Sequence, residues 1–303
     1  QVSEPPPGVH VPFAGAATVP AVREITIRDC LTHTAGFPAG PASPGANDPS
    51  RTIREQVEEL ASRPLVFQPG AGWLYGPGLN VAGVICEIIS GQTLDRFMRE
   101  RIFEPLGMPD TSFYLDEAKL DRFPPLYQSV PQDPVTGWKL REQDRPETSV
   151  KVRGPKVQFG GSGGLLSSAH DYARFAQMLL NGGALDGVRL LGRKTVELMT
   201  QNHTGNYFIY VRGRGYGYGL GVGVRLNVTE FPAVGTPGTY GWGGAFSTYY
   251  FADPKEEMFG LIFLQVNPST ARTDVEAERT NQPEHMRRAG QEFERLAYQA
   301  LVD

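Results

Sequence analysis

Cysteine is scarce in this sequence of 303 residues, which contains only Cys30 and Cys86. Each lies in an apolar, helix-like pattern, as buried thiols usually do, and this argues against a disulfide framework or a cysteine-based metal site. The five histidines lie apart without ligand spacing, and no glycine-rich phosphate loop or nucleotide fingerprint occurs between a strand and a helix. We therefore expect neither a metal nor another cofactor.

Long apolar runs are missing too. The longest nearly continuous one, residues 258–266, is too short to span a bilayer and predicts a buried strand. An excess of one charge is also absent, since 29 basic and 33 acidic residues are mixed along the chain and give a formal net charge of −4. No surface for nucleic acid or an anionic membrane is therefore expected, and small neutral molecules are the simpler partners.

Three parts follow one another along the chain, which is 40% hydrophobic and so has enough apolar material for a globular core. Residues 1–23 are rich in proline and predict an irregular segment. Residues 24–204 have mainly helical spacing, whereas residues 205–303 change to extended segments and end with a helix from Pro283. Short turns between strands predict an antiparallel sheet, and this order of elements is α+β. The expected strands are 217–226, 247–252 and 258–266.

Local signals refine the helical part. Thr26 and Asp29 have the spacing of a capping box, so a helix should begin here and end at Gly36. Apolar residues on most sides of the segment 79–90 predict a mostly buried helix. Prolines multiply and periodicity disappears between residues 116 and 160, where we expect a long irregular excursion.

Four segments stand out by their order and spacing. Residues 25–37 carry Thr-His-Thr-Ala-Gly-Phe, residues 75–108 begin with Tyr-Gly-Pro-Gly, residues 160–175 begin with Gly-Gly-Ser-Gly-Gly, and residues 240–254 contain Trp-Gly-Gly. Together they resemble the serine β-lactamase and penicillin-binding-protein-like family, especially its carboxylesterases and acyltransferases. The resemblance implies a β-lactamase/transpeptidase-like fold, an antiparallel sheet with flanking helices plus a helical region, and acyl transfer through an acyl-enzyme.

The resemblance also implies a site. Tyr75 matches the family tyrosine whose phenol exchanges a proton with the nucleophilic serine or the leaving group. Trp242, Gly243 and Gly244 stand where β-lactam-binding members carry Lys-Thr-Gly on an edge strand, and the Ala245 N–H would be one oxyanion donor. Because Trp242 replaces the lysine that would pair with a β-lactam carboxylate, the match favours esterases of uncharged acyl groups. Each assignment has a structural alternative, in which Tyr75 only holds its loop in place by packing and Trp242 is a core residue beside a β-bulge.

Two further residues of these segments are less direct candidates. In β-lactamases an asparagine follows two residues after the tyrosine, but Pro77 occupies that place here. Asn80 is therefore a candidate for a polar role, with helix capping as the alternative. His33 matches the family's Thr-His-Thr signature, and we predict a turn residue with local hydrogen bonds rather than a catalytic one.

The nucleophile motif of the family, Ser-x-x-Lys, is absent, because no serine is followed three residues later by lysine. In the family this motif lies well upstream of Thr-His-Thr. We therefore expect that the N-terminal strands and the nucleophile helix are missing from this chain, that this missing segment is its partner, and that the chain alone is inactive. The sheet should then have an unfilled edge. The expected substrate is a small ester or amide, and the protein should be soluble and of bacterial type, with cytoplasm or periplasm left open.

Two other functions fit parts of the sequence. Residues 160–164 match Gly-x-Ser-x-Gly, the nucleophile elbow of α/β-hydrolases, in which Ser162 would attack, residues 150–159 would form the strand, and His203 or His285 would complete the triad. Charged residues and a proline before the motif disfavour this interpretation, because an elbow follows an apolar parallel strand. A non-catalytic binding protein on the same fold is the other alternative, since it would lack the serine.

Overall fold

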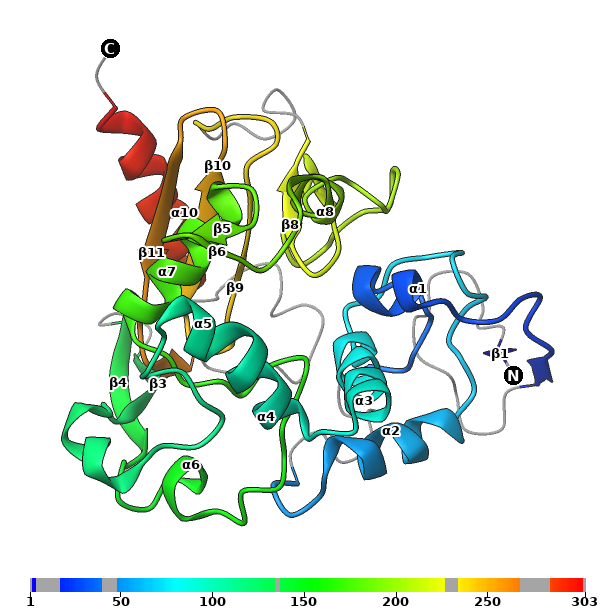
Figure 1. Ribbon diagram of the computed structural model, residues 1–303, viewed down its shortest axis with the longest axis horizontal. Coiled ribbons are helices and arrows are strands. Elements are labelled where there is room, and N and C mark those ends of the chain that lie inside the picture. The colour runs from blue at the N-terminus through cyan, green and yellow to red at the C-terminus, as the bar shows by residue number, and fades with distance from the viewer. Residues whose placement is uncertain are drawn as a thin grey trace.

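Helices form one side of the molecule, and a β-sheet with its own covering helices forms the other (Figure 1). The computed structural model describes residues 2–3, 17–39, 48–133, 137–226, 234–267 and 284–301, and the structural statements below concern this part of the chain. The helical side consists of α1 (Ile27–Thr32), α2 (Ile53–Ala61) and α3 (Gly78–Ser90). A longer helical stretch leads towards the sheet as α4 (Leu94–Met98), the π-helical turn η2 (Arg99–Phe103) and α5 (Glu104–Leu106).

Side-chain caps define where α1 begins. The Thr26 hydroxyl accepts the Asp29 N–H while the Asp29 carboxylate accepts the Thr26 N–H, so the predicted capping box is confirmed. α1 already ends at His33, which takes the left-handed conformation with φ of 59°, and the predicted stop at Gly36 is wrong. α3 ends as predicted at Gly91, whose φ is 67°.

α3 is less buried than its apolar sequence suggests. Gly83 and Val84 are buried, but Ile88 and Ile89 are 61% and 79% exposed, so the prediction of a mostly buried helix is wrong. The neighbours of α3 are α1, α2 and α4. They cover one side of the helix and leave its C-terminal isoleucines uncovered within the described residues.

Regular structure also occurs where an irregular excursion was expected, between residues 116 and 160. This region contains a 3₁₀ turn, a hairpin and a short helix: η3 (Glu117–Arg122), β3 (Leu126–Asp133), β4 (Gly137–Asp144) and α6 (Val150–Arg153). Residues 139–143 of β4 are exposed and residues 126–130 of β3 are half-buried or buried, and neither strand has the alternation of apolar and polar residues that marks a strand in the sequence. Pairing between the two strands, and of β3 with β12 (Val266–Asn267), forms it instead.

The main sheet has the strand order β11-β10-β9-β8-β7, and all neighbouring pairs are antiparallel, as predicted. Its strands are β7 (Tyr216–Tyr218), β8 (Gly223–Arg225), β9 (Tyr240–Gly243), β10 (Tyr249–Asp253) and β11 (Met258–Ile262). The single strand expected over 217–226 is a hairpin, because the chain turns between β7 and β8 at Gly221, with φ of 88°. Within the described residues β11 pairs only with β10, so the outer edge of the sheet is open there.

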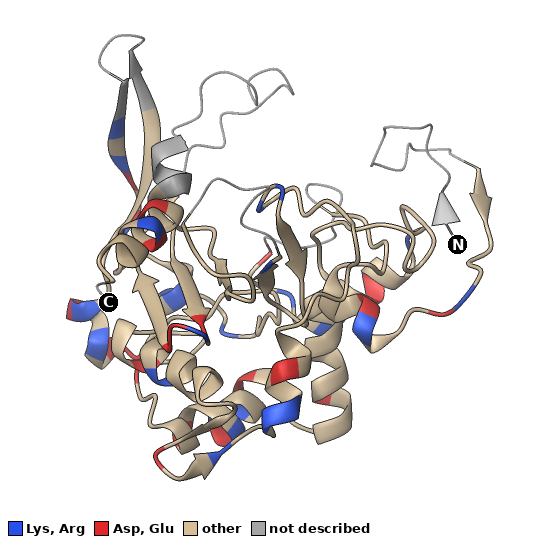
Figure 2. Cartoon of the chain, turned by 90° about the horizontal axis from the view of Figure 1, so that it is seen from above, with Lys and Arg blue, Asp and Glu red and all other residues tan. Residues whose placement is uncertain are grey.

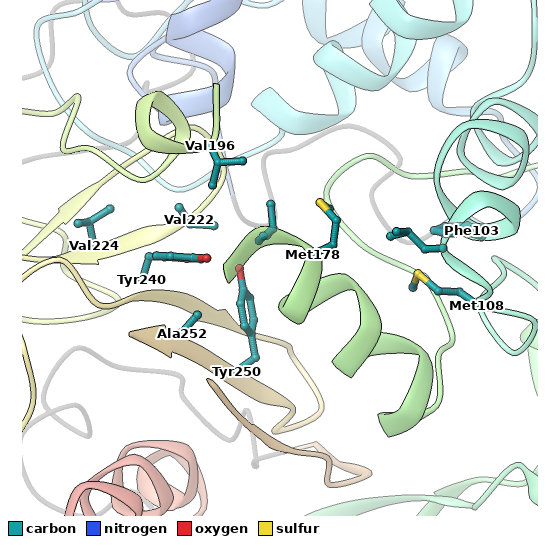
Figure 3. Close-up of a cluster of buried hydrophobic side chains, with 11 residues drawn as sticks. Phe103, Met108, Met178, Val196, Val222, Val224, Tyr240, Tyr250 and Ala252 are labelled. Carbon is teal, nitrogen blue, oxygen red and sulfur yellow. The ribbon is translucent and has the colours of Figure 1, made fainter. Parts of the chain in front are cut away.

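The helices that cover the sheet are α7 (Ala169–Leu180) and α10 (Glu284–Gln299). Alternating side chains of a strand point to opposite faces. In β10, Tyr250 and Ala252 belong to the same buried cluster as Met178 of α7, which Figure 3 shows above the strands. Phe251 lies in a second cluster with Tyr298 of α10. The two helices therefore cover opposite faces.

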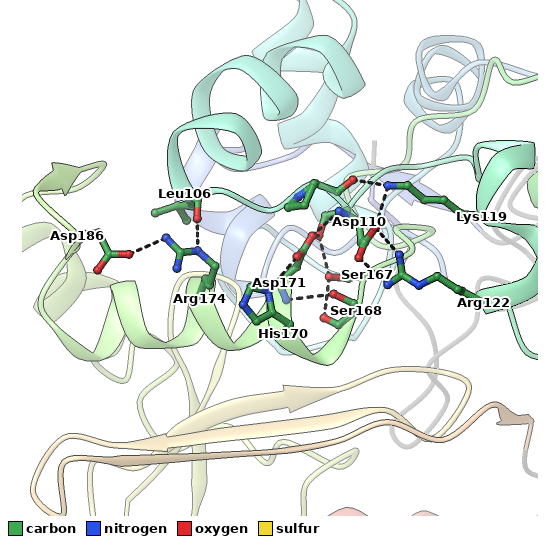
Figure 4. Close-up of polar contacts among 12 residues, drawn as sticks. Leu106, Asp110, Lys119, Arg122, Ser167, Ser168, His170, Asp171, Arg174 and Asp186 are labelled. Carbon is green, nitrogen blue, oxygen red and sulfur yellow. Dashed lines mark hydrogen bonds and ion pairs between the residues drawn. The ribbon is translucent and has the colours of Figure 1, made fainter.

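Buried polar groups tie α7 to the turn after α5 (Figure 4). The Ser168 hydroxyl accepts the Asp171 N–H at the start of α7. The Asp171 carboxylate, only 1% exposed, accepts the Asp110 N–H at 2.7 Å and the Thr111 hydroxyl at 3.0 Å. It thereby satisfies groups on a segment 60 residues away and fixes the helical connection beside the core.

The remaining elements are short: β1 (Val2–Ser3), β2 (Thr18–Val19), β5 (Ala184–Leu185), β6 (Val188–Arg189) and α8 (Arg193–Met199). Acidic and basic residues are interspersed along the helices and loops, without a region of one sign (Figure 2). In the described ranges, none of the helices combines the length and the apolar character that crossing a bilayer requires.

Candidate active site

Tyr75 and Trp242 meet at the junction of the two sides of the molecule. Tyr75 lies in the loop before α3, and Trp242 lies in β9. The Trp242 indole N–H donates a long hydrogen bond to the Tyr75 hydroxyl, with 3.4 Å between nitrogen and oxygen. Their ring centroids are 5.5 Å apart. Two of the predicted site residues, 167 positions apart in sequence, are thus in direct contact.

The strand next to Trp242 has a free backbone edge. β9 pairs with β8 only through Tyr240 and Gly241, so from Trp242 onward its one partner among the described strands is β10. The chain then turns, and the Gly244 N–H donates to the Thr248 carbonyl. β9 is therefore the middle strand of the sheet and not the edge strand that the resemblance implied, but from Trp242 onward it lacks a partner on one side among the described strands.

Exposed backbone follows this edge. Gly243, Gly244 and Ala245 are all exposed. Among the described residues no group accepts the Ala245 N–H. A bound molecule can approach the backbone closely at the two glycines, because neither carries a side chain. The predicted residues thus form a short exposed segment that directly follows Trp242.

His33 is the buried centre of the same site. Only 3% of it is exposed, and its ring centroid lies 4.6 Å from that of Tyr75 and 5.1 Å from that of Tyr218. Its Nδ1 accepts the Gly76 N–H at 3.3 Å, a contact across 43 residues. The predicted local hydrogen bonds are therefore wrong for this side chain: its ring bonds to the tyrosine loop.

Burial sets the protonation of His33. Loss of solvent lowers the pKa of the imidazole to about 4, because a charged ring would be poorly solvated there. The ring is neutral at pH 7. Since Nδ1 accepts a hydrogen bond, the proton of the neutral ring is on Nε2, and this atom is enclosed without a partner among the described residues.

Asp29 holds the turn that carries His33. Burial alone would raise the pKa of this carboxyl, but hydrogen bonds from Arg23, Thr26 and Thr34 outweigh it and hold the pKa below its usual range. Arg23 binds both carboxylate oxygens, at 2.7 and 2.8 Å. The turn is therefore braced by an ionised carboxylate at neutral pH.

A cation lies against Trp242 from within the protein. The Arg212 guanidinium is 5.1 Å from the Trp242 ring centroid and 4.9 Å from that of Tyr249, distances typical of cation–π contacts. Its Nε is buried and has no hydrogen-bond partner among the described residues. The strand that lacks the motif lysine thus has an arginine beside it, stacked on aromatic rings.

The sequence profile of the family described as Beta-lactamase matches residues 7–282. The chain belongs to the β-lactamase family. Its fold is the β-lactamase/transpeptidase-like α+β fold, because solved structures of this kind superpose on most of it. One is EstCE1, a hydrolase with promiscuous acyltransferase activity: it has a TM-score of 0.67 and 22% identity, and the match covers 88% of this chain and 71% of EstCE1.

Two curated relatives are more than 30% identical to this chain. Protein Rv1367c of Mycobacterium tuberculosis is 34% identical over an alignment of 311 positions, and the match covers 94% of this chain and 73% of that protein. Lovastatin esterase of Penicillium rubens is 32% identical over 269 residues, which cover 81% of this chain and 65% of the esterase. The chain therefore spans about two thirds to three quarters of the length of these two relatives.

Asn80 does not cap α3, and its side chain bonds to a distant loop. Pro77 occupies the cap position of α3 and no side chain caps this helix. Instead, the Asn80 side-chain oxygen accepts the Ser162 N–H at 2.9 Å. A side chain at Gly161 would lie 2.1 Å from the Leu79 carbonyl oxygen, so glycine is needed for this loop to reach α3. The Gly-Gly-Ser-Gly-Gly segment thus packs on the helix that follows Tyr75.

The nucleophile elbow at Ser162 lacks the structure it requires. Residues 150–153 form a helix instead of a strand, and residues 154–164 are irregular, so no strand leads into the serine. His203 uses its ring to bind the Leu198 carbonyl. The side chain of His285 lies outside the described residues.

Sequence reasoning missed an aromatic loop beside the site. Tyr210 packs edge-on against Trp73, with 5.2 Å between ring centroids, and Trp73 in turn stacks at 6.3 Å on Tyr75. The Tyr207 hydroxyl donates to the Gly70 carbonyl and anchors this loop to the tyrosine loop. The sequence signal that could have indicated this loop is the cluster of aromatic residues at 207–210 between two glycines.

Proposed function

We propose that this chain contributes most of the active site of a serine hydrolase that transfers acyl groups through an acyl-enzyme, as a carboxylesterase or acyltransferase. The contact between the Trp242 N–H and the Tyr75 hydroxyl carries the proposal, because it sets a phenol that can transfer protons next to a strand with a free backbone N–H. The relation to lovastatin esterase supports the esterase assignment.

Each residue has a distinct task in this proposal. Tyr75 acts as a phenolate beside the ammonium of the Ser-x-x-Lys lysine: it takes the proton of the attacking serine and then gives the same proton to the leaving group. The Ala245 N–H stabilises the oxyanion of the tetrahedral intermediate. Gly243 and Gly244 let the acyl group lie against the strand, and Trp242 provides a ring surface without a charge. The substrate is accordingly a small ester or amide with an uncharged acyl group.

The nucleophilic serine, in the same proposal, comes from residues outside this chain. No serine here has the Ser-x-x-Lys spacing, and Lys151, the basic group at the Ser162 loop, donates to the Gly164 carbonyl rather than to the Ser162 hydroxyl. The preceding segment of the coding sequence is the expected source, and it would also be the structural partner of the open edge of β11. The chain alone should therefore be inactive.

Covalent labelling tests the origin of the serine. We expect the protein made from its complete coding sequence to react with a fluorophosphonate and to give a burst with p-nitrophenyl esters, whereas residues 1–303 alone should give neither. The labelled peptide should contain Ser-x-x-Lys. Labelling of Ser162, or silence of the complete protein, contradicts the proposal, and silence would favour a binding protein.

Substitution of the tyrosine tests its task. In the complete protein, Y75F should lower kcat for p-nitrophenyl esters by about 100-fold or more, since general acid–base catalysis contributes about 10² to 10⁴. Y114F is the matched control, because Tyr114 is equally half-buried but packs in a different cluster. Equal activity of Y75F and Y114F would refute the role of Tyr75.

A further inference from the structure

The contacts of His33 converge on one residue. Its carbonyl accepts the Leu74 N–H at 3.0 Å, and its Nδ1 accepts the Gly76 N–H at 3.3 Å. Between these two contacts lies Tyr75, whose ring centroid is 4.6 Å from that of the imidazole. The backbone on both sides of the tyrosine and the tyrosine ring itself are thus all held by a single histidine.

The backbone of His33 has a conformation that is unfavourable for a residue with a side chain. With φ of 59°, it caps α1 in the left-handed conformation that glycine adopts without strain. A side chain in this conformation costs free energy, and such strain persists only where the surrounding structure holds the residue in place. Helix capping alone would be served better by glycine.

Packing leaves the imidazole little freedom. The cavity beside it, lined by residues of the Thr-His-Thr turn and the tyrosine loop, has a volume of only about 10 Å³, close to that of one water. Tyr218 and Trp73 close other sides of the ring, with centroids at 5.1 and 5.9 Å. A ring held in this way restricts where the Tyr75 ring beside it can lie.

We infer that His33 is a positioning residue for Tyr75: as a neutral ring it accepts the Gly76 N–H and fixes the direction of the phenol towards Trp242. This inference rests on the proposed function, in which Tyr75 transfers the proton. His33 itself contacts no reacting atom. Its contribution passes through Tyr75 and must vanish when the phenol is removed.

Two substitutions separate the bond from the backbone strain. H33G relieves the strain but lacks the acceptor, and H33N keeps a side-chain oxygen near the place of Nδ1 in a residue that tolerates positive φ. In the complete protein we expect H33G to lower kcat about 100-fold with little change in KM, because small misplacements of catalytic groups have effects of this size. H33N should recover kcat to within about 10-fold of the wild type. If H33G does not fold, H33S replaces it, because its side chain is too short to reach Gly76.

A double-mutant cycle decides whether His33 acts through the phenol. H33G should have no further effect on kcat in the Y75F background. Amide exchange at Gly76 should be about 10-fold faster in H33G than in the wild type and near normal in H33N. Additive effects on kcat, or unchanged exchange at Gly76, would overturn the inference while leaving the proposed function intact. If Y75F itself keeps wild-type kcat, the proposed function fails and the inference with it.

Discussion

The buried carboxylate of Glu294 offers a direct test of how α10 is fastened to the sheet. Its side chain is 4% exposed and pairs with Arg225, whose side chain is 3% exposed, and it accepts a hydrogen bond from Tyr249. The nearly isosteric change E294Q removes the charge and also turns one of the two acceptor oxygens, which bind Arg225 and Tyr249, into an NH2 donor. At an effective dielectric constant of about 20, two charges about 4 Å apart attract each other by about 4 kcal/mol. Breaking a buried pair in this way typically costs about 3–5 kcal/mol.

We therefore expect the free energy of unfolding of E294Q to be about 3–5 kcal/mol lower than that of the wild type. Urea unfolding at pH 7, followed by circular dichroism, measures this as a lower midpoint with an unchanged slope. E292Q is the matched control, because Glu292 lies on the same helix and its ion pair with Arg295 is solvent-exposed. This variant should unfold at the wild-type midpoint.

The reasoning is refuted if E294Q and E292Q unfold at the same urea concentration. That result would mean that water or other groups compensate the Arg225 charge in the native state. A large loss in both variants would instead indicate that α10 depends on its exposed charges, contrary to its packing on Phe251 and Tyr249.

Three further predictions concern the site and its supports. Because burial lowers the pKa of His33 to about 4 from about 6.5 in the unfolded chain, its contribution to stability should be complete above pH 6.5 and fall by about 3 kcal/mol down to pH 4, and H33N should lack this fall in urea titrations. G78A should destabilise the fold by about 1–3 kcal/mol in thermal unfolding, because the new methyl would lie 2.3 Å from the Cys30 carbonyl oxygen. G192A, whose nearest neighbour lies at 3.6 Å, should cost only the poorer N-cap that alanine gives α8. N80A should cost about 1 kcal/mol and speed amide exchange at Ser162, which loses its acceptor; unchanged exchange would contradict the bond.

Local signals predicted where α1 begins and where α3 ends, but neither the end of α1 nor the burial of α3. The capping box of Thr26 and Asp29 involves residues close in sequence, so its geometry could be predicted. The end of α1 at His33 could not, because a histidine takes the left-handed conformation there only through contacts with the distant tyrosine loop. Ile88 and Ile89 show the same limit, since burial depends on neighbours that periodicity does not reveal.

The candidate site was predicted from family motifs, and its surroundings were not. Tyr75 and Trp242 matched known positions, and they are in contact. Arg212 and Tyr210 carry no motif, because their part in the site arises from ring packing between segments far apart in the chain. The hairpin of β3 and β4 escaped prediction for a related reason: its strands form by pairing with each other and with β12, and their sequences lack the alternation of apolar residues.

The aromatic character of the site gives it an optical property. Of the three tryptophans in the sequence, Trp73 and Trp242 both lie against Tyr75, and the third, Trp138, belongs to β4. Indole emission depends on nearby hydrogen bonds and water. Intrinsic fluorescence can therefore report binding near Tyr75 without any label, and W138F would leave a signal that comes from Trp73 and Trp242 alone.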